Sequence, residues 1–353
     1  MRIDLPRSPR ILVVVLQRLG DVLLTTPLIR SLKRAWPDAR IDALVFSDTA
    51  GILAGNPDID TVIAMPPRLG ASQGLALAAR LWRRYALAVS AQSGDRPTFF
   101  AIVAGRAAAA PVERRLNGRI KKMLLRRSVA AGDRIHRMRQ ILRLAEAIGV
   151  APVAEVVPPA PLPPPLTLPD SYAVIHAAPM FRYKRWTADG WRALAAALAR
   201  RGLKVVATGG PSPQERAYLD GVFGGADVLR ADGLLDWREL AGLLARARLY
   251  VGPDTSVTHL AAATGVPTVA LYGPTDPVLW GPWPANDPHG DWSPAGAIQR
   301  RSNVWLVQNQ LPCVPCQLEG CERGLGSYSR CLDAMPLNSV LAAVDQALAG
   351  PAK

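Results

Sequence analysis

Four turns in the sequence place glycine beside a carboxylate, a hydroxyl group or a proline, each directly after an apolar run. They are Leu19-Gly20-Asp21, Gly209-Gly210-Pro211, Gly252-Pro253-Asp254-Thr255 and Gly273-Pro274-Thr275-Asp276. Open parallel sheets bind ligands at the carboxyl ends of their strands, so we expect functional side chains in these turns. The sequence has no G-x-G-x-x-G after its first apolar run and no G-x-x-x-x-G-K-[ST]. That weakens the interpretations as a nicotinamide-dependent dehydrogenase and as a P-loop nucleotide hydrolase.

The segment from Asp254 to His259 opens a predicted helix of small residues, 260–264. Free backbone N–H groups and the positive dipole end at such a helix start can bind an anion, and a diphosphate suits this chemistry. The alternative is structural, because Asp254 or Thr255 can be an ordinary N-cap and His259 an ordinary helix residue.

Asp21 offers a carboxylate at the start of the first predicted helix, just beyond the first predicted strand. In that position it can accept a proton from a hydroxyl group as a general base. It can also be the N-cap of the helix, which is the commoner role of an aspartate at a helix start.

Parallel strands are needed to position these turns. Residues 11–16, 21–36 and 41–46 predict a strand, an amphipathic helix and a second strand, which together form a β-α-β unit. A second alternating series is predicted at residues 172–176, 187–201, 204–208, 236–248, 249–252, 255–264 and 267–272. Such alternation of strands and helices indicates an α/β fold with parallel sheets.

The two series are separated by residues 151–170, which contain eight prolines. Proline interrupts helices and central strands and favours extended chain, so this segment is predicted to be a linker. We therefore expect an N-terminal domain at residues 1–150 and a C-terminal domain at residues 171–353. A chain of 353 residues is long enough for two ordinary domains.

The composition, with 49% hydrophobic and 20% charged residues, is that of a globular protein. No apolar run reaches the roughly 18 residues of a membrane-spanning helix, and residues 11–16 are too few for the apolar part of a signal peptide. We therefore expect a cytoplasmic protein. All four cysteines lie between residues 313 and 331, which excludes a disulfide framework distributed over the chain.

The chain is basic, with 42 Lys and Arg against 28 Asp and Glu. Eleven of the basic residues lie in residues 113–143, where Leu116, Ile120, Met123 and Leu124 recur at helical spacing. This pattern predicts a basic amphipathic surface that contacts an anionic partner, although a solvated helix face produces the same pattern.

Four pieces of the sequence carry a resemblance to a known family. They are residues 16–30 (Leu-x-Arg-Leu-Gly-Asp-Val-Leu-Leu-Thr-Thr-Pro-Leu-Ile-Arg), 183–186 (Tyr-Lys-Arg-Trp), 254–262 (Asp-Thr-Ser-Val-Thr-His-Leu-Ala-Ala) and 271–276 (Leu-Tyr-Gly-Pro-Thr-Asp). In this order they resemble the heptosyltransferases of lipopolysaccharide core assembly, glycosyltransferase family 9, including its heptosyltransferase II-like members.

The resemblance implies a GT-B fold, in which two Rossmann-like parallel-sheet domains face an interdomain cleft. The N-terminal domain would bind the acceptor and the C-terminal domain the ADP-sugar donor. Asp21 falls on the position of the catalytic base, and Lys184 falls on the lysine that neutralises the diphosphate of the donor. The donor-binding residues that the resemblance implies are Lys184, Glu239, Asp254, Thr255, Ser256 and His259.

The implied activity is transfer of heptose from ADP-heptose to the inner core of lipopolysaccharide, with inversion and without a metal or other cofactor. Asp21 would take the proton of the acceptor hydroxyl group, while Lys184 and the helix start at residue 255 would stabilise the departing ADP. The basic region 113–143 would contact the anionic lipid A and inner-core acceptor and the inner face of the cytoplasmic membrane, so we expect peripheral membrane association.

The cysteines form the pattern Cys313-x2-Cys316-x4-Cys321-x9-Cys331. Four thiolates can close a tetrahedral zinc site, but a zinc ribbon normally has two C-x-x-C pairs and this pattern has one. A structural zinc ion and reduced structural thiols are therefore both open interpretations.

Two other functions are alternatives to this activity. The chain could be a family relative that transfers another nucleotide-activated sugar, because the sequence identifies neither the donor sugar nor the acceptor hydroxyl group. It could also be a noncatalytic basic protein that binds anionic surfaces or nucleic acid, which the net charge of +14 would favour. The sequence has no recognisable nucleic-acid module, so we expect no nucleic-acid partner.

Overall fold

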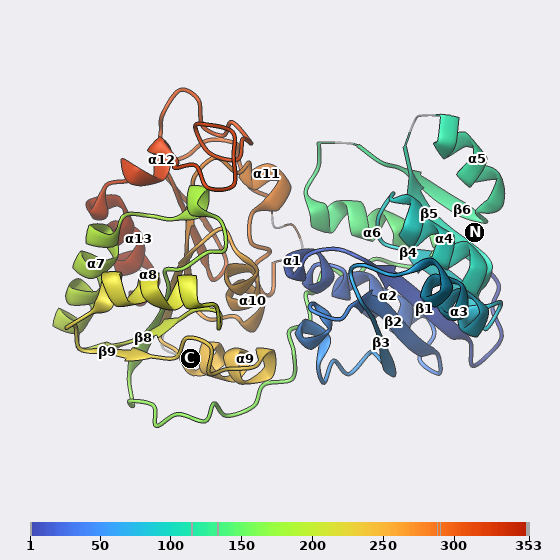
Figure 1. Cartoon of the computed structure of the whole chain (residues 1–353), viewed down its shortest axis with the longest axis horizontal. Helices are drawn as coiled ribbons and strands as arrows, with labels where there is room; N and C mark the ends of the chain where they lie inside the picture. Colours follow the sequence, from blue (N-terminus) through green and yellow to red (C-terminus); the bar gives the residue numbers. More distant parts are fainter. Residues whose placement is uncertain (1, 114–115, 133, 288, 290, 351–353) are drawn as a thin grey trace. The chain divides into compact units, whose positions relative to one another are not determined.

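The structure is a computed structural model that describes residues 2–113, 116–132, 134–287, 289 and 291–350 (Figure 1). The chain divides into two compact units, Met1–Ala160 and Pro161–Lys353. The boundary falls inside the predicted linker 151–170, whose first half belongs to the first unit and whose second half belongs to the second. None of the helices among these described residues is both long and apolar enough to cross a membrane.

The first unit is built on a sheet with the strand order β3-β2-β1-β4-β5-β6, in which each pair of neighbours is parallel. Its strands are β1 (Arg10–Val15), β2 (Arg40–Phe46), β3 (Thr61–Met65), β4 (Tyr85–Ser90), β5 (Gly105–Val112) and β6 (Arg127–Ala130). The chain begins in the middle of the sheet, runs outward through β2 and β3, and returns to the other side of β1 as β4. This reversal of strand order is the arrangement of Rossmann folds.

Helices cover both faces of this sheet (Figure 1). They are α1 (Leu19–Leu23), α2 (Thr26–Ala35), the 3-10 helix η1 (Ala50–Leu53), α3 (Ala71–Leu81), α4 (Asp95–Ala104), α5 (Leu116–Leu124) and α6 (Arg137–Ile148). Leu12 and Val14 of β1 pack with Phe100 of α4, while the alternate residues Ile11 and Val13 are also fully buried. Burial on both faces is the reason that a central parallel strand is a continuous apolar run.

The helix predicted at residues 21–36 is two helices in the structure. Helix α1 ends at Leu23, and α2 starts at Thr26 with Pro27 in its first turn. Proline lacks the N–H group that would continue the hydrogen bonding of α1, so a break occurs before it. The hydroxyl group of Thr25 donates to the carbonyl of Asp21 at 2.8 Å and closes the end of α1.

The basic stretch 113–143 is not one amphipathic surface, because its described residues form α5, β6 and the start of α6. The apolar residues that the prediction named at helical spacing all lie in α5. Its Ile120, Met123 and Leu124 are 57%, 86% and 61% exposed, so they face solvent rather than the core. Three parts of this prediction lie outside the described residues: Arg114, Arg115 and the side chain of Leu116.

The second unit is built on a sheet with the strand order β12-β13-β11-β10-β7-β8-β9, parallel except for the β12–β13 pair. Its strands are β7 (Tyr172–His176), β8 (Lys204–Thr208), β9 (Val228–Arg230), β10 (Leu249–Pro253), β11 (Thr268–Tyr272), β12 (Ile298–Arg301) and β13 (Val304–Gln308). Strand order reverses between β7 and β10, so this unit is also Rossmann-like.

The second sheet also has helices on both faces (Figure 1). They are η2 (Arg182–Lys184), α7 (Ala188–Arg200), α8 (Pro213–Phe223), α9 (Trp237–Arg246), α10 (Ser256–Thr264), α11 (Pro277–Trp280), α12 (Arg330–Asp333) and α13 (Leu337–Leu348). Val269 and Leu271 of β11 belong to a core with α7, α8 and α13, whereas Ala270 and Tyr272 pack with Ala262 of α10. Alternate residues of β11 therefore serve two separate cores.

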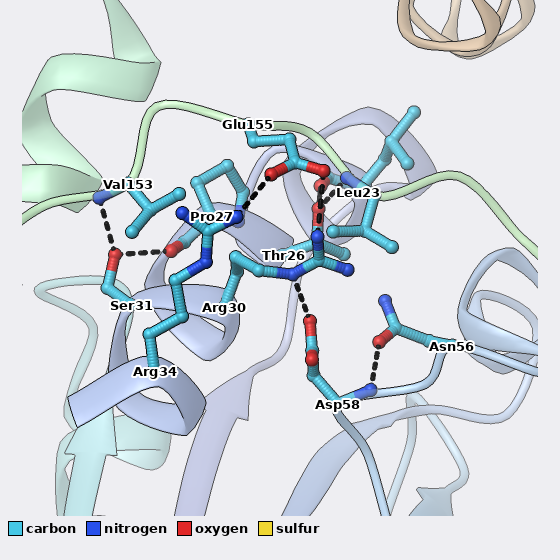
Figure 2. A network of polar contacts seen from close by, with 11 residues as sticks. Leu23, Thr26, Pro27, Arg30, Ser31, Arg34, Asn56, Asp58, Val153 and Glu155 are labelled. Carbon is cyan, nitrogen blue, oxygen red and sulfur yellow. Dashed lines mark hydrogen bonds and ion pairs between the residues drawn. The ribbon is translucent and has the colours of Figure 1, made fainter. Parts of the chain in front are cut away.

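The chain segment that leads out of the first unit is fastened to α2 (Figure 2). Arg30 donates to Asp58 at 2.5 Å and to Glu155 at 2.7 Å, and Arg34 donates to Glu155 at 3.2 Å. Two backbone N–H groups of the segment bind hydroxyl groups of α2, Val153 to Ser31 and Val157 to Thr26, each at 2.9 Å. The first part of the predicted linker is thus held against α2 of the first unit by ion pairs and hydrogen bonds.

Candidate active site

The predicted site residues follow the central strands of both sheets, where strand order reverses. In the first sheet Asp21 follows β1, which pairs with β4. In the second sheet Lys184 follows β7 and Asp254 follows β10, and these two strands are neighbours. Open α/β sheets bind their ligands at the carboxyl ends of such strands, so each unit has a candidate site at its expected edge.

A side-chain amide secures the backbone just before Asp21. Oε1 of Gln92, which follows β4, accepts the N–H of Leu16 at 2.8 Å, and its Nε2 donates to the Leu16 carbonyl at 3.1 Å. These are the two hydrogen bonds that the backbone of a neighbouring strand would make with Leu16. The Gln92 amide therefore extends the pairing of β1 by one residue toward α1.

Asp21 is paired with an arginine and is not a helix cap. It is the third residue of α1, whose N-cap is Arg18, and no side chain caps this helix. Its Oδ1 accepts from Nε of Arg137, the first residue of α6, at 3.1 Å. Arg137 also donates to the carbonyl of Ala91 at 3.0 Å, which holds the guanidinium group in place. The alternative interpretation of Asp21 as the N-cap is therefore wrong.

The surroundings of Asp21 favour proton transfer. Burial raises the pKa of Asp21 above its ordinary value, although the charge and hydrogen bond of Arg137 and the charge of Arg18 act in the opposite direction. A raised pKa makes a carboxylate a stronger base toward a hydroxyl proton. Asp21 thus combines a fixed orientation with the basicity that a general base needs.

In the second unit the structure brings Lys184 and Asp254 together. Nζ of Lys184 donates to Oδ2 of Asp254 at 2.6 Å, and the hydroxyl group of Thr275 donates to the same oxygen at 2.7 Å. Burial raises the pKa of Asp254, but the charges of Lys184 and His259 and the two hydrogen bonds outweigh burial and hold it below its ordinary value. An ammonium group has three N–H donors, so Lys184 retains two for a ligand.

The start of α10 lies directly beside this ion pair. Thr255 is its N-cap and accepts the N–H of Thr258 at 3.4 Å, which confirms the capping interpretation for Thr255 but not for Asp254. Ser256 is the first helical residue, and both Thr255 and Ser256 are partly exposed. The first N–H groups of a helix have no partner within the helix, so this helix start, together with Lys184, can bind an anion.

His259 is buried with one ring nitrogen unsatisfied. The residue is 6% exposed, and among the described residues its Nδ1 has no hydrogen-bond partner. Burial lowers the pKa of His259 to about 4, against the opposing charge of Asp254, so the ring is neutral at pH 7. A buried polar atom without a partner is unfavourable, so Nδ1 is a natural contact for a ligand at the start of α10.

The carboxylate of Glu239 caps the start of α9 and does not join the Lys184–Asp254 pair in the described part of the chain. Its Oε2 accepts the backbone N–H of Asp236 at 2.8 Å, and Oδ1 of Asp236 accepts the N–H of Glu239 at 2.8 Å. The pair is a capping box that starts α9. No hydrogen bond or ion pair within the described part of the chain joins Glu239 to Lys184 or Asp254.

The cysteines do not form a recognisable metal centre. Cys313 and Cys321 are exposed, Cys316 is partly exposed and Cys331 is buried. Burial, with the nearby thiols of Cys316 and Cys321, raises the pKa of Cys331 to about 12. Among the described residues, which include all four cysteines, no group of three or more His, Cys, Asp or Glu side chains is placed to hold a metal ion. The zinc interpretation therefore gains no support from the geometry.

Three residues of these sites were not identified from the sequence. Thr275 lies in one of the glycine-containing turns, so its position was a signal for it. Arg137 is one of eleven basic residues in the stretch 113–143, and its partner Asp21 is 116 positions away. Gln92 follows β4, and nothing in the sequence around it indicates that its amide binds Leu16.

Comparison with known sequences finds similarity to glycosyltransferases. Residues 154–293 match the profile of Glycosyltransferase family 9 (heptosyltransferase). The chain is 29% identical over 290 residues to lipopolysaccharide heptosyltransferase 3 of Escherichia coli K12, covering 76% of this chain and 83% of that protein. It is 28% identical over 329 residues to lipopolysaccharide heptosyltransferase 1 of Pseudomonas aeruginosa PAO1, covering 88% and 87%.

Solved structures show the same fold. A glycosyl transferase family 9 protein from Veillonella parvula aligns with a TM-score of 0.75 and 19% identity, over 96% of this chain and 97% of that chain. The E. coli heptosyltransferase WaaC with ADP aligns with a TM-score of 0.72 and 20% identity, over 96% and 99%. The predicted GT-B fold, with its two Rossmann-like parallel-sheet units, is confirmed.

Proposed function

We propose, since the chain belongs to glycosyltransferase family 9, that it transfers heptose from ADP-heptose to the inner core of lipopolysaccharide with inversion at the anomeric carbon. The chain is an enzyme of the transferase class, a heptosyltransferase of lipopolysaccharide core assembly. The acceptor step and the stereochemistry are the finer parts of the proposal. A related solved structure contains ADP and another contains ADP-2-deoxy-2-fluoro heptose, which supports ADP-heptose as the donor.

One observation carries the proposal most directly. Lys184, ion-paired with a buried Asp254 at 2.6 Å, lies beside the N-terminus of α10, close to the unsatisfied Nδ1 of His259. A diphosphate needs positive charge and N–H donors, and this cluster offers both. We assign donor binding in the second unit to Lys184, Asp254, Thr255, Ser256 and His259, and acceptor binding to the first unit.

The role proposed for Glu239 must be compatible with the capping box that its carboxylate forms with Asp236. To contact the ribose of the donor, its carboxylate would have to leave the backbone N–H of Asp236 or use its other oxygen. A carboxylate has two oxygens and about four acceptor sites, so the second oxygen can accept a ribose hydroxyl group while the capping box persists.

In the proposed reaction Asp21 accepts the proton of an acceptor hydroxyl group as that oxygen attacks the anomeric carbon of heptose. A new C–O bond forms while the bond from this carbon to the diphosphate oxygen breaks, and ADP leaves with the electron pair. Displacement from the opposite face inverts the anomeric centre. Arg137 positions the Asp21 carboxylate, whereas Lys184 and the α10 N-terminus stabilise the charge that develops on ADP.

The proposal requires no metal, because Lys184 and α10 supply the positive charge at the diphosphate. Turnover in the presence of a chelator tests this directly. Unchanged turnover in excess EDTA is expected, and a loss that Mg²⁺ restores would contradict it.

Peripheral contact with the inner face of the cytoplasmic membrane is also proposed, through α5. This helix exposes Ile120, Met123 and Leu124 beside Arg119 and Lys122. Exposed apolar side chains among basic ones suit an anionic lipid surface, where each basic residue contributes about 1 kcal/mol of attraction.

Sedimentation with phosphatidylglycerol vesicles tests the α5 contact. Met123→Ser with Leu124→Ser should reduce binding about tenfold, since burying two such side chains contributes roughly 1.5 kcal/mol or more. Leu75→Ser, at a 70% exposed position of α3, is the matched control and should bind as the unaltered chain does. Equal binding by all three proteins would contradict the assignment.

A donor screen tests the transferase activity. The full chain is incubated with heptose-deficient lipopolysaccharide and either ADP-heptose or UDP-sugars, and the product mass and anomeric configuration are measured. Heptose addition with inverted configuration is expected from ADP-heptose alone. Transfer from another nucleotide sugar would instead establish a family relative of different donor specificity, and retention of configuration would exclude the mechanism.

A further inference from the structure

The first unit contains a cavity of about 410 Å³ at the edge opposite Asp21. It lies at the amino ends of the strands, since Arg10, Thr61 and Tyr85 are the first residues of β1, β3 and β4. Its size falls within the range of small-molecule sites, about 300–1,000 Å³. A six-residue strand spans about 20 Å, so the cavity is separated from the Asp21 edge by roughly that length.

A buried carboxylate organises one wall of this cavity. Asp42 of β2 is 3% exposed, and its Oδ2 accepts from Arg10 at 2.9 Å and from the Tyr85 hydroxyl group at 2.7 Å. The Arg10 guanidinium group also lies over the Tyr85 ring, 5.1 Å from its centroid. Arg10 is thereby held in one orientation toward the cavity, which lowers the entropy lost when it binds a ligand.

Two further arginines line the same cavity without a counter-ion in the described part of the chain. Arg80, near the end of α3, and Arg84, just before β4, are exposed, and their side chains make no ion pair or hydrogen bond with described residues. Three guanidinium groups against the single carboxylate of Asp42 give the lining a net charge of +2. Like charges that line one cavity repel one another, and an anion bound there would reduce the repulsion.

We propose that this cavity binds a sugar phosphomonoester. Arginine forks match phosphate oxygens, and a phosphomonoester carries a charge of about −1.5 to −2 at pH 7, which complements the net charge of the lining. The second Asp42 oxygen would repel a bare phosphate but can accept a hydrogen bond from a sugar hydroxyl group. The arginines and the Asp42 carboxylate together therefore favour a phosphate group joined to a sugar over inorganic phosphate alone.

The phosphomonoester has two possible sources, a free sugar phosphate or a phosphorylated sugar of the acceptor. Both present the same chemistry to the arginines. The acceptor source depends on the proposed function, whereas binding of a free sugar phosphate does not, so the two can be tested separately.

Calorimetric titration of the full chain with glucose 6-phosphate at low salt is the first arm, with glucose and inorganic phosphate as comparison ligands. Arg80→Ala with Arg84→Ala removes two exposed cavity charges and should leave the thermal unfolding transition unchanged. Arg68→Ala with Arg200→Ala removes two exposed arginines elsewhere and is the matched charge control. If the source is a free sugar phosphate, glucose 6-phosphate binds at least about tenfold tighter than glucose or phosphate, and only the cavity variant loses this binding.

The second arm measures transfer to phosphorylated and dephosphorylated lipopolysaccharide acceptor. If the source is the acceptor, the cavity variant raises the KM for the phosphorylated acceptor about tenfold with kcat unchanged, and leaves the dephosphorylated acceptor unaffected. The proposal is overturned if the cavity variant equals the control variant in both arms. Absence of any transfer by the unaltered chain would refute the proposed function, while the first arm would still decide the cavity.

Discussion

Replacing Asp21 with asparagine separates the proposed catalytic role of this residue from its structural one. Asparagine keeps the shape and an oxygen that can accept from Arg137, but it cannot take up a proton at neutral pH. If Asp21 is the general base, kcat should fall by about 10²–10⁴-fold, equivalent to roughly 3–5 kcal/mol of transition-state stabilisation. Binding of ADP should be unchanged, because the donor residues belong to the other unit.

The stability of the Asp21→Asn variant should change in the opposite direction from its activity. Because the pKa of Asp21 is raised on folding, its contribution to stability is present below its unfolded value of about 4 and is lost as pH rises through the folded pKa. At pH 7 the ionised carboxylate is therefore a net burial cost that the variant lacks. The variant should unfold at an equal or higher temperature at pH 7, and this advantage should disappear as pH approaches 4.

The assay combines transfer kinetics with thermal unfolding from pH 4 to pH 8. Asp189→Asn is the matched control, since Asp189 is also an aspartate in the first turn of a helix that pairs with an arginine, but its side chain is 91% exposed. The control should change neither kcat nor the pH dependence of stability. Near-normal turnover of Asp21→Asn would refute the base assignment, and a large loss of stability at pH 7 would refute the argument from burial.

Three other changes test separate parts of the structure. Lys184→Ala should lower kcat by about 10²-fold and also destabilise the chain by about 2 kcal/mol, because it leaves the buried Asp254 without its counter-ion. Lys184→Arg, which keeps the charge, should restore stability more than turnover, and unchanged kcat/KM for both variants would show a surface role only. Arg30→Ala should cost about 2 kcal/mol in urea unfolding by leaving Asp58 unpaired, whereas Arg7→Ala, at a 96% exposed position, should cost nothing measurable. Protein purified without chelator should contain less than about 0.2 zinc per chain if the cysteines at 313–331 are plain structural thiols, and a full equivalent of metal would establish the zinc interpretation.

Much of the fold could be predicted because buried parallel strands are continuous apolar runs. Residues 172–176 and 204–208 match β7 and β8 at both ends. The break between α1 and α2 was missed although Pro27 signals it, because the apolar periodicity continues across it. The basic amphipathic surface predicted over residues 113–143 is confined to α5, where Ile120, Met123 and Leu124 face solvent.

The candidate site was less accessible to sequence reasoning. The turns after the strands pointed to Asp21 and Asp254, since chain direction alone places strand ends at one edge of a sheet. Lys184 was singled out only through the family resemblance, because an isolated lysine 70 positions from Asp254 carries no local signal. Arg137 could not be distinguished from its basic neighbours, since pairing with Asp21 depends on where the first turn of α6 lies relative to α1 and not on either local sequence.

The Gln92 amide has a consequence for backbone dynamics. Because it binds both the N–H and the carbonyl of Leu16, the peptide hydrogen of Leu16 is protected as if it lay inside the sheet, although β1 has already ended. Its exchange with deuterium should therefore require the same opening event as that of Val14, instead of local fraying. Gln92→Glu would set a carboxylate against the Leu16 carbonyl, and deuterium uptake at Leu16 should then become independent of uptake in the sheet. Helix α1, which carries the proposed base Asp21, is in this way joined to the central strands of the sheet through one side chain.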